Sequence, residues 1–220
     1  MKIREKEVLR YLGCGPNPPD EALGKLIASC DEELLRCVSP RCVFRTFPLR
    51  FDGGSVWVGS LEVPGRSLRE HLSGCREAVL FAATLGVQAD VLLERSARLE
   101  ISRAAVLQAA SAAAIESFCD EQEAEIARDA ARRGLFLRPR FSPGYGDFPI
   151  RLQREILTLL DCPKRIGLTA TDSFMLAPAK SVTAVIGLTA EKTSCHIAKC
   201  MGCHAENCPF RKEQADESAE

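Results

Sequence analysis

A ten-residue stretch in the second half of the chain constrains the fold most. It reads Arg140-Phe-Ser-Pro-Gly-Tyr-Gly-Asp-Phe-Pro149. Proline lacks a backbone donor and glycine weakens regular elements, so this stretch cannot be the middle of a helix or a central strand. We predict a shaped loop. The loop leads into a predicted helix over Ile150–Asp161. Asp147 is expected to cap this helix, with Pro149 in its first turn.

The loop carries groups that suit a ligand. Arg140 offers a planar fork of donors for a carboxylate or phosphate, and Tyr145 offers a flat face with a polar tip. Pro143 presets the backbone, and Gly144 lets it come close to a bound molecule. The same residues also suit a surface turn in which Arg140 pairs with a neighbouring acid.

The remaining pattern predicts an α+β fold with a mixed or antiparallel twisted sheet covered by helices. Leu23, Ile27, Leu34 and Leu35 are expected to face inward on the second helix. The expected elements are helices over Glu5–Leu12, from an Asp20 cap to about Val38, from a Ser67 cap through Leu72, over Gln88–Ala97 and over Ser102–Arg133; a hairpin of Cys42–Phe51 and Ser55–Val58; and strands Ala78–Leu85, Ile166–Thr169 and Val182–Leu188.

Glu116 stands out within its predicted helix. It lies in the otherwise apolar turn Ala112–Phe118, where an ionised carboxylate needs a partner to offset desolvation. That partner is either a ligand cation or simply Arg140.

Three motifs in fixed order carry a family resemblance. Arg140-x-x-Pro-Gly-Tyr145 is followed by Lys164–Thr169, then by Thr171-Asp-Ser-Phe-Met175 and Pro178-Ala-Lys-Ser-Val182. This order resembles the C-terminal activation domain of cobalamin-dependent methionine synthase, with its Arg-x-x-x-Gly-Tyr-Pro, Thr-Glu-Ser-Phe and Pro-x-x-Ser-Val segments. Gly146 stands where the family usually has proline, and Asp172 where it often has glutamate. The likeness covers Arg140–Thr189 and extends weakly back to about Ala78.

The resemblance implies an activation-domain-like fold over residues 1–190 that binds S-adenosylmethionine. Glu116 would accept the ligand ammonium, Arg140 would clamp its carboxylate, and Tyr145 would form a wall beside the ribose or adenine. Backbone groups of Phe141, Ser142, Pro143 and Gly144 would meet the remaining polar edges.

The resemblance also implies a function. Such a domain supports reductive remethylation of inactive cob(II)alamin, with a methyl group from S-adenosylmethionine and an electron from a flavodoxin-like or ferredoxin-like donor. The domain positions the methyl donor and needs no catalytic acid, base or nucleophile of its own. The chain contains no Asp-x-His-x-x-Gly cobalamin motif. We therefore expect a free-standing module that acts on cobalamin-binding methionine synthase modules or another corrinoid protein.

Residues 191–220 form a cysteine-rich tail whose end is too polar to bury. Cys195, Cys200, Cys203 and Cys208 are separated by four, two and four residues. Closely spaced thiolates suit zinc or an iron–sulfur cluster, with free or redox-sensing thiols as the alternative. We expect most of the other cysteines to be small buried hydrophobes.

Composition excludes several classes of function. A net charge of −1 gives no electrostatic reason to expect binding to nucleic acid or to an anionic membrane. No apolar run has the length of a membrane span, and the start lacks a signal-peptide core, so the cytoplasm is expected.

Two alternative functions stay open: a redox-coupled activator whose tail carries a metal or iron–sulfur cluster, and an interaction module without turnover. We do not predict the common methyltransferase fold, because no Gly-x-Gly motif follows an early strand with an acid at the expected distance.

Overall fold

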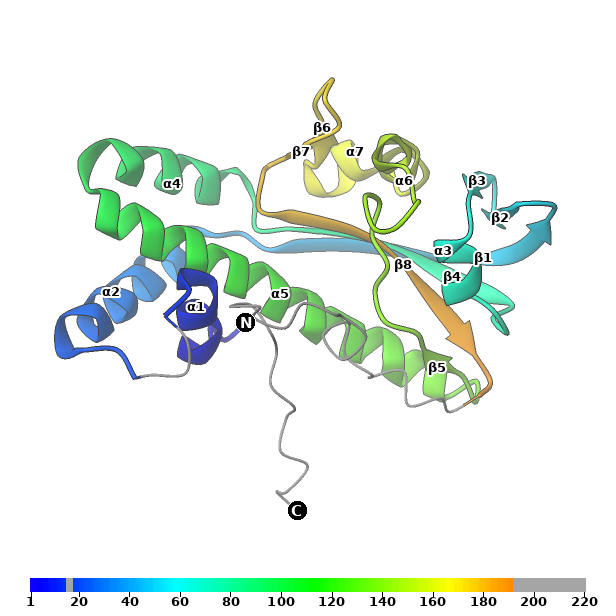
Figure 1. Ribbon diagram of the computed structural model, residues 1–220, viewed down its shortest axis with the longest axis horizontal. Helices are drawn as coiled ribbons and strands as arrows, with labels where there is room; N and C mark the ends of the chain where they lie inside the picture. The colour runs from blue at the N-terminus through cyan, green and yellow to red at the C-terminus, as the bar shows by residue number, and fades with distance from the viewer. Residues whose placement is uncertain (15–17, 192–220) are drawn as a thin grey trace, which may run out of the picture.

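A six-stranded antiparallel sheet forms the centre of the protein. The computed structural model describes residues 1–14 and 18–191, and Figure 1 shows the sheet with helices packed around it. The strand order is β3-β2-β1-β4-β8-β5, and every neighbouring pair is antiparallel. The predicted α+β class is therefore confirmed. The strands are β1 (Arg41–Asp52), β2 (Ser55–Val58), β3 (Leu61–Pro64), β4 (Glu77–Thr84), β5 (Phe136–Leu137) and β8 (Ser181–Thr189), and a separate two-stranded sheet pairs β6 (Thr169–Ala170) with β7 (Leu176–Ala177).

Strand β4 separates two hydrophobic cores. Phe81 and Ala83 enter one core, whereas Leu80 and Ala82 enter the other, because successive side chains of a strand point to opposite faces. Phe81 lies opposite Ala184 of β8, so the same division continues across the sheet. A strand buried on both faces requires an unbroken apolar run, and the sequence has that run here.

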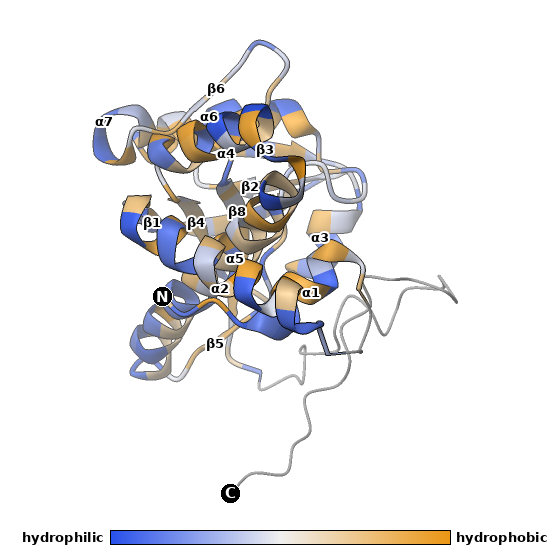
Figure 2. Cartoon of the chain, turned by 90° about the vertical axis from the view of Figure 1, so that its left-hand side faces the viewer, coloured by the Kyte–Doolittle hydropathy of each residue, from blue (hydrophilic) through white to orange (hydrophobic). Residues whose placement is uncertain are grey.

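The helices divide between these two cores. The first core contains α1 (Glu5–Leu12), α2 (Glu21–Cys37), α4 (Val87–Leu99) and α5 (Ile101–Ala131). The second contains α3 (Ser67–His71), the 3₁₀ turn η1 (Ile150–Leu152), α6 (Gln153–Leu159) and α7 (Cys162–Ile166). Figure 2 shows hydrophobic and hydrophilic segments alternating along these helices, as amphipathic packing requires.

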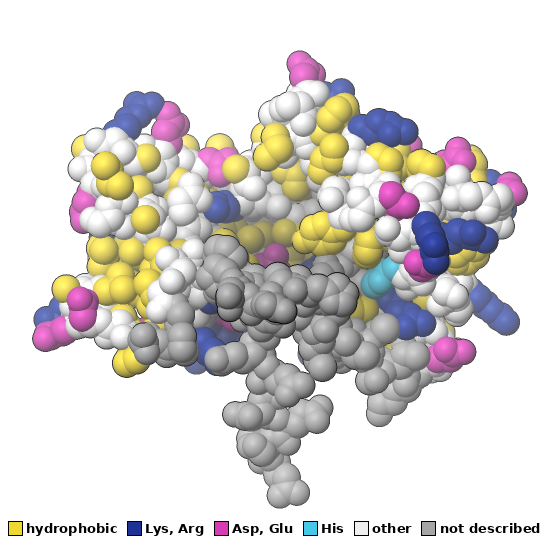
Figure 3. Space-filling model, viewed as in Figure 1, with side chains coloured by type: hydrophobic (Ala, Val, Ile, Leu, Met, Phe, Trp, Pro, Cys, Tyr) yellow, Lys and Arg dark blue, Asp and Glu magenta, His cyan; other side chains and the backbone are white. Residues whose placement is uncertain are grey.

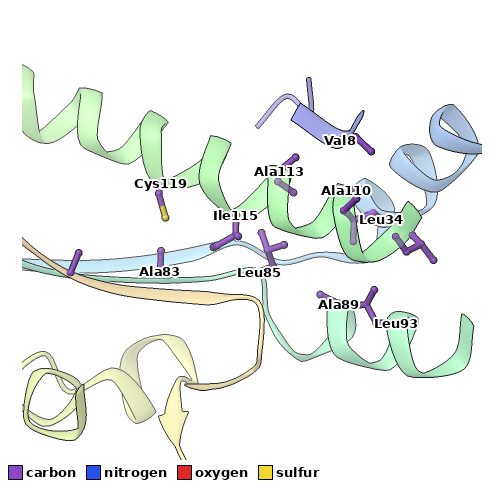
Figure 4. Packing of buried hydrophobic residues seen from close by; sticks show 14 of the residues in the cluster. Val8, Leu34, Ala83, Leu85, Ala89, Leu93, Ala110, Ala113, Ile115 and Cys119 are labelled. Carbon is purple, nitrogen blue, oxygen red and sulfur yellow. The ribbon is translucent and has the colours of Figure 1, made fainter. Parts of the chain in front are cut away.

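Small residues let α5 lie close to the sheet. Ala110, Ala113 and Ala114 are buried, and Figure 4 shows Ile115 and Cys119 of α5 on the side that faces Ala83 and Leu85. This alanine-rich stretch can approach the sheet closely because its side chains are small. The boundary between the two predicted helices falls at Glu100, which is extended between α4 and α5.

Several predicted helix ends are confirmed. Gly13 ends α1 in the left-handed conformation. Asp20 caps α2 by accepting the backbone N–H of Leu23 at 2.7 Å. On α2, Ile27 and Leu34 are buried as expected and Leu23 is partly buried, but Leu35 is exposed. Cys30 is buried there as well.

Two capping predictions are wrong for one shared reason. Asp147 does not cap the helix that follows it, because its carboxylate accepts the backbone N–H groups of Arg66 and Ser67 at 2.6 and 3.0 Å. It therefore caps α3 from a distant part of the chain. Ser67 is the first residue of α3 and not its cap. The helix after the loop starts as η1 and continues as α6, ending at Leu159.

The predicted strand Ile166–Thr169 is also largely wrong. Asp161 adopts a left-handed conformation with φ of 53°, which turns the chain after α6. Pro163 then lies in the first turn of α7, where its missing donor costs little. Only Thr169 of the predicted range belongs to a strand, β6. Strand β8 confirms the prediction for Val182–Leu188.

Candidate functional site

Arg140 is the centre of a charged cluster. The chain after β5 crosses in front of β8 toward α6 (Figure 1), and Arg140 lies at the start of this crossing. Its side chain is only 15 % exposed. Its Nη2 donates to Glu116 Oε2 at 3.0 Å and to Asp120 Oδ1 at 2.8 Å, and its Nη1 donates to Glu123. The predicted partners Glu116 and Arg140 are thus brought together.

The three acids share one face of α5. Their spacing of four and then three residues places Glu116, Asp120 and Glu123 on successive turns. The prediction identified only Glu116, because it alone interrupts an apolar turn. Asp120 and Glu123 lie in the polar half of the helix, where acids usually face solvent. Helical spacing from Glu116 is the signal that would have found them.

Charge is not balanced within this cluster. Three carboxylates surround one guanidinium, so negative charge is in excess. Burial by itself lowers the pKa of Arg140, but Glu123, Asp120 and Glu116 outweigh it and raise that pKa above its ordinary value. Glu116 and Asp120 are 40 % and 65 % exposed, so the excess charge faces solvent. Such a cluster attracts a cation, and the bonds to the acids use three of the five N–H donors of Arg140.

Backbone bonds hold the loop in shape. Phe141 exchanges both of its backbone hydrogen bonds with Val185 of β8, at 2.9 Å each. Gly144 has φ of +92° and donates its N–H to the carbonyl of Phe148 at 2.8 Å. The backbone of Phe141 and the N–H of Gly144, expected to meet a ligand, are therefore used inside the protein. The carbonyl of Ser142 accepts the N–H of Tyr145 at 3.1 Å.

Aromatic rings anchor the loop below its surface. Phe148 is buried and stacks on Phe141 with the ring centroids 6.4 Å apart. Tyr145 meets Phe141 edge-on at 6.0 Å and remains largely exposed. The ring of His71 in α3 also contacts Phe141, with the ring centroids 5.0 Å apart. Tyr145 is thus held at the surface, where it can form a wall of a site.

Two glycines allow the loop to meet the start of α3. A Cβ on Gly65 would lie 2.6 Å from the carboxylate carbon of Asp147, and one on Gly146 would lie 2.4 Å from Ser67 Oγ. Both glycines also have positive φ. The cap that Asp147 gives to α3 therefore requires glycine at both positions.

The N-terminal segment packs beside Glu116. Ser117 Oγ donates to the carbonyl of Lys2 at 2.8 Å. Burial raises the pKa of Tyr11 in α1, and the negative charge of Glu116 raises it further. Sequence reasoning did not identify Tyr11 because nothing in its local pattern connects it with α5.

The Thr171–Met175 segment forms the turn between β6 and β7 and is held in place from α6. Arg154 Nη2 donates to the Thr171 carbonyl at 2.8 Å and to Asp172 Oδ1 at 3.0 Å. Gln153 donates to the carbonyl of Phe174 at 2.8 Å and accepts the Thr183 hydroxyl at 2.9 Å. The motif segment is thus tied to β8.

The molecular face in Figure 3 is hollowed near its centre, with hydrophobic side chains in the hollow.

The predicted metal ligands Cys195, Cys200, Cys203 and Cys208 lie outside the described residues. Within residues 1–14 and 18–191, no group of three or more His, Cys, Asp or Glu side chains could hold a metal ion. The seven cysteines of these ranges form no disulfide bond with one another, and Cys30, Cys75, Cys119 and Cys162 are buried as expected. Burial raises the pKa of Cys162 to about 12. In the same ranges, no helix has the length and apolar character needed to cross a membrane.

Comparison with known proteins supports the fold. No family model matches the chain, and no curated protein matches it. Among solved structures, the chain is similar to the MetH reactivation domain bound to AdoHcy, with a TM-score of 0.63. The match covers 88 % of this chain and 72 % of that one, at 16 % sequence identity. The two proteins share a fold.

Proposed function

We propose that this chain is a free-standing module that binds S-adenosylmethionine and supports reductive remethylation of cob(II)alamin on a separate corrinoid protein. Two findings support the proposal: the fold of the MetH reactivation domain bound to AdoHcy, and the charged cluster on α5. The observation that carries it is the excess of carboxylates around Arg140, next to a loop held in a fixed conformation.

The charge of the ligand matches the charge of this cluster. S-adenosylmethionine has an ammonium, a sulfonium and one carboxylate, so it is a net cation. Glu116 accepts the ligand ammonium. The charge of Asp120, one turn further along α5, adds to the attraction. The two remaining donors of Arg140 hold the ligand carboxylate. Each charge-assisted hydrogen bond contributes roughly 1.5–3 kcal/mol, so two or three support micromolar affinity.

The contribution of the chain is to bind and orient. When bound, S-adenosylmethionine supplies the methyl group that the cobalt of the partner accepts. Tyr145 limits the site on one side, and the Phe141–Val185 pair fixes the loop against the sheet edge. Holding the donor in one orientation lowers the entropic cost of the transfer, and this requires no proton transfer by a side chain.

Calorimetric titration with S-adenosylmethionine tests the site. We expect saturable binding that weakens at least about tenfold in Arg140→Ala and in Glu116→Gln. Asp129→Asn is the matched control, because Asp129 is an exposed acid on α5 that pairs with Arg132 at 3.0 Å. Circular dichroism melts establish that each variant folds. Absence of binding by the intact chain, or equal binding by all four proteins, contradicts the proposal.

The action on a separate protein needs its own test. A corrinoid protein in the cob(II)alamin state is mixed with a flavodoxin-like or ferredoxin-like donor, S-adenosylmethionine and this chain. We expect the absorbance of methylcobalamin to develop only when the chain is present, and not with Arg140→Ala. Equal development without the chain refutes the role in remethylation while leaving ligand binding intact.

The cysteine-rich tail supports a second candidate role. If Cys195, Cys200, Cys203 and Cys208 hold an iron–sulfur cluster, the chain acts as a redox activator of a corrinoid methyltransferase. Metal analysis of anaerobically purified protein decides this. Brown protein with iron and sulfide supports the redox role, whereas colourless protein with zinc or without metal refutes it. Binding of both ligand and partner without methyl transfer would identify an interaction module.

A further inference from the structure

Strand β1 has an open edge along its first half. Residues Arg41–Pro48 pair with β4 on one side, whereas β2 pairs only with Leu49–Asp52 on the other. Figure 1 accordingly shows β2 and β3 at one end of the longer β1. Within the described part of the chain, no strand lies beside the edge of β1 that precedes Pro48.

The register shows which backbone groups of this edge are unpaired. Residues of an antiparallel strand bond alternately to the strand on one side and to the strand on the other. The N–H of Leu49 donates to the carbonyl of Arg76, just before β4, at 2.9 Å, and the carbonyl of Pro48 accepts the N–H of Gly59, just after β2, at 3.0 Å. Odd-numbered residues of β1 thus bond toward β4. The residues whose N–H and C=O groups point toward the open edge are Cys42, Phe44 and Thr46.

Three arginines lie on one face of this edge. Arg41 and Arg45 share the face of Val43, whose side chain enters the second core. Arg165 of α7 joins them, because it lines an open hollow of about 270 Å³ with Val43 and its two neighbours in β1. All three arginines are exposed, and none forms an ion pair with another described residue. Asp161 lies one turn before Arg165 and offsets only part of their charge.

The opposite face of the edge is less polar. Cys42 packs partly against the first core, and Phe44 beside it is 41 % exposed. Glu125 of α5 lies close enough to Cys42 to interact with it electrostatically, but it pairs with Arg128 at 3.8 Å. A strand added to this edge would therefore meet arginines on one face and an aromatic ring on the other.

We propose that the open edge of β1 binds an extended segment of another protein, in which carboxylate side chains alternate with apolar ones. The unpaired N–H and C=O groups bind the backbone of that segment, which adds a strand to the sheet. Its carboxylates face Arg41, Arg45 and Arg165, and its apolar side chains face Phe44, because side chains alternate between the faces of a strand.

A second copy of this chain fits the edge poorly. Pairing two β1 edges would place Arg41 and Arg45 of one copy on the same face as those of the other, and like charges on paired strands repel. The proposal is also independent of the proposed function, because β4 separates β1 from β8, whose Val185 holds the loop after Arg140.

Fluorescence anisotropy with a designed peptide tests the proposal. The full chain, kept reduced, is titrated into a labelled nine-residue peptide that alternates glutamate with valine. We expect saturable binding, and at least about tenfold weaker binding of the same peptide with lysine in place of glutamate. No binding of the glutamate peptide, or equal binding of both peptides, overturns the proposal.

Two variants separate the charge from the backbone contribution. Arg45→Glu should weaken the glutamate peptide at least about tenfold, whereas Arg36→Glu is the matched control, since Arg36 forms an exposed ion pair with Glu32 on α2. Thr46→Pro removes one outward N–H and should weaken the peptide as well. The fold should accept it, because Pro48 already occupies such a position in β1. Binding that Arg45→Glu leaves unchanged overturns the proposal.

Amide hydrogen exchange measured by NMR locates the binding edge. In the free chain, the amides of Cys42, Phe44 and Thr46 should exchange at least about tenfold faster than those of Val43 and Arg45, and the peptide should slow them. Slow exchange of all five in the free chain overturns the proposal. Slow exchange that depends on protein concentration would then identify a second copy on the edge, and slow exchange at every concentration a segment of the same chain.

Discussion

Asp147 accepts the backbone N–H of Ser67 on its Oδ1 at 3.0 Å, across 80 residues of sequence. Its other oxygen accepts the N–H of Arg66. One carboxylate therefore ends the Arg140–Pro149 loop and starts α3. These backbone hydrogen bonds lower the pKa of Asp147. Its stabilising contribution is present above the pKa of an unfolded aspartate and is lost only as pH falls through the lowered folded value.

We expect Asp147→Ala to loosen both segments that this carboxylate joins. Hydrogen exchange should accelerate at Arg66 and Ser67 and in the loop around Tyr145, because two donors lose their acceptor. The control is Asp52→Ala, which removes an exposed ion pair with Arg50. Unchanged exchange at Ser67 in Asp147→Ala would show that the cap does not hold the loop.

Glycine at position 65 is required by contact as well as by conformation. Gly65→Ala should lower the free energy of unfolding by roughly 2 kcal/mol, from backbone strain and from collision with Asp147. Gly74→Ala separates the two causes, because Gly74 also has positive φ but a Cβ at this position would meet nothing within 4 Å. Chemical denaturation should find Gly74→Ala the milder change, and equal losses would refute the contact.

Phe81 and Phe44 are cross-strand neighbours with different burial. Phe81 is fully buried in the first core, whereas Phe44 is 41 % exposed. Phe81→Ala should cost about 3–5 kcal/mol of stability, as a large cavity in a core does. Phe44→Ala should cost less than half of that. Urea denaturation measures both losses of stability. If the two variants lost equal stability, Phe81 would not be covered by α5 as the structure shows.

Asp31 should make stability depend on pH. Burial raises its pKa to about 6, with a further contribution from the charge of Glu5, and its Oδ1 is buried without a hydrogen-bond partner among the described residues. A raised folded pKa means that its stabilising contribution is full below the unfolded pKa and is lost as pH rises through about 6. Asp31→Asn should therefore be more stable than the parent by about 1 kcal/mol near neutral pH, and not in acid. Melting curves that differ equally at all pH values would refute this.

The charge excess around Arg140 predicts selectivity between two ligands. S-adenosylhomocysteine lacks the sulfonium charge, so it should bind at least about tenfold more weakly than S-adenosylmethionine. Added salt should weaken the binding of S-adenosylmethionine more than that of S-adenosylhomocysteine, because salt screens the attraction of the sulfonium to Glu116 and Asp120. Calorimetry at two salt concentrations measures both effects. Equal affinities would mean that the sulfonium charge gains no attraction from these carboxylates.

Elements with a strong local cause could be predicted from the sequence. Strand β4 is an apolar run because both of its faces are buried, and α5 is alanine-rich because it lies close to the sheet. Asp20 caps α2 through a bond three residues away, which local rules describe. The Glu116–Arg140 contact was predicted as one of two alternatives, from an acid in an apolar turn and an arginine in a loop.

Features set by tertiary contact could not be predicted in this way. Local rules assign Asp147 to the nearest helix, but its partners come from α3. Asp120 and Glu123 resemble any solvated helix face until the loop places Arg140 beside them. Asp161 turns the chain in a conformation that only glycine usually signals, so α7 was missed.

A co-crystal structure of the full chain with S-adenosylmethionine would show directly whether the Arg140 cluster binds this ligand. We expect the ligand ammonium within hydrogen-bond distance of Glu116, its carboxylate at Arg140 and its adenosine beside Tyr145. Ligand bound elsewhere, or crystals grown at saturating ligand with the Arg140 cluster unchanged and empty, would contradict it.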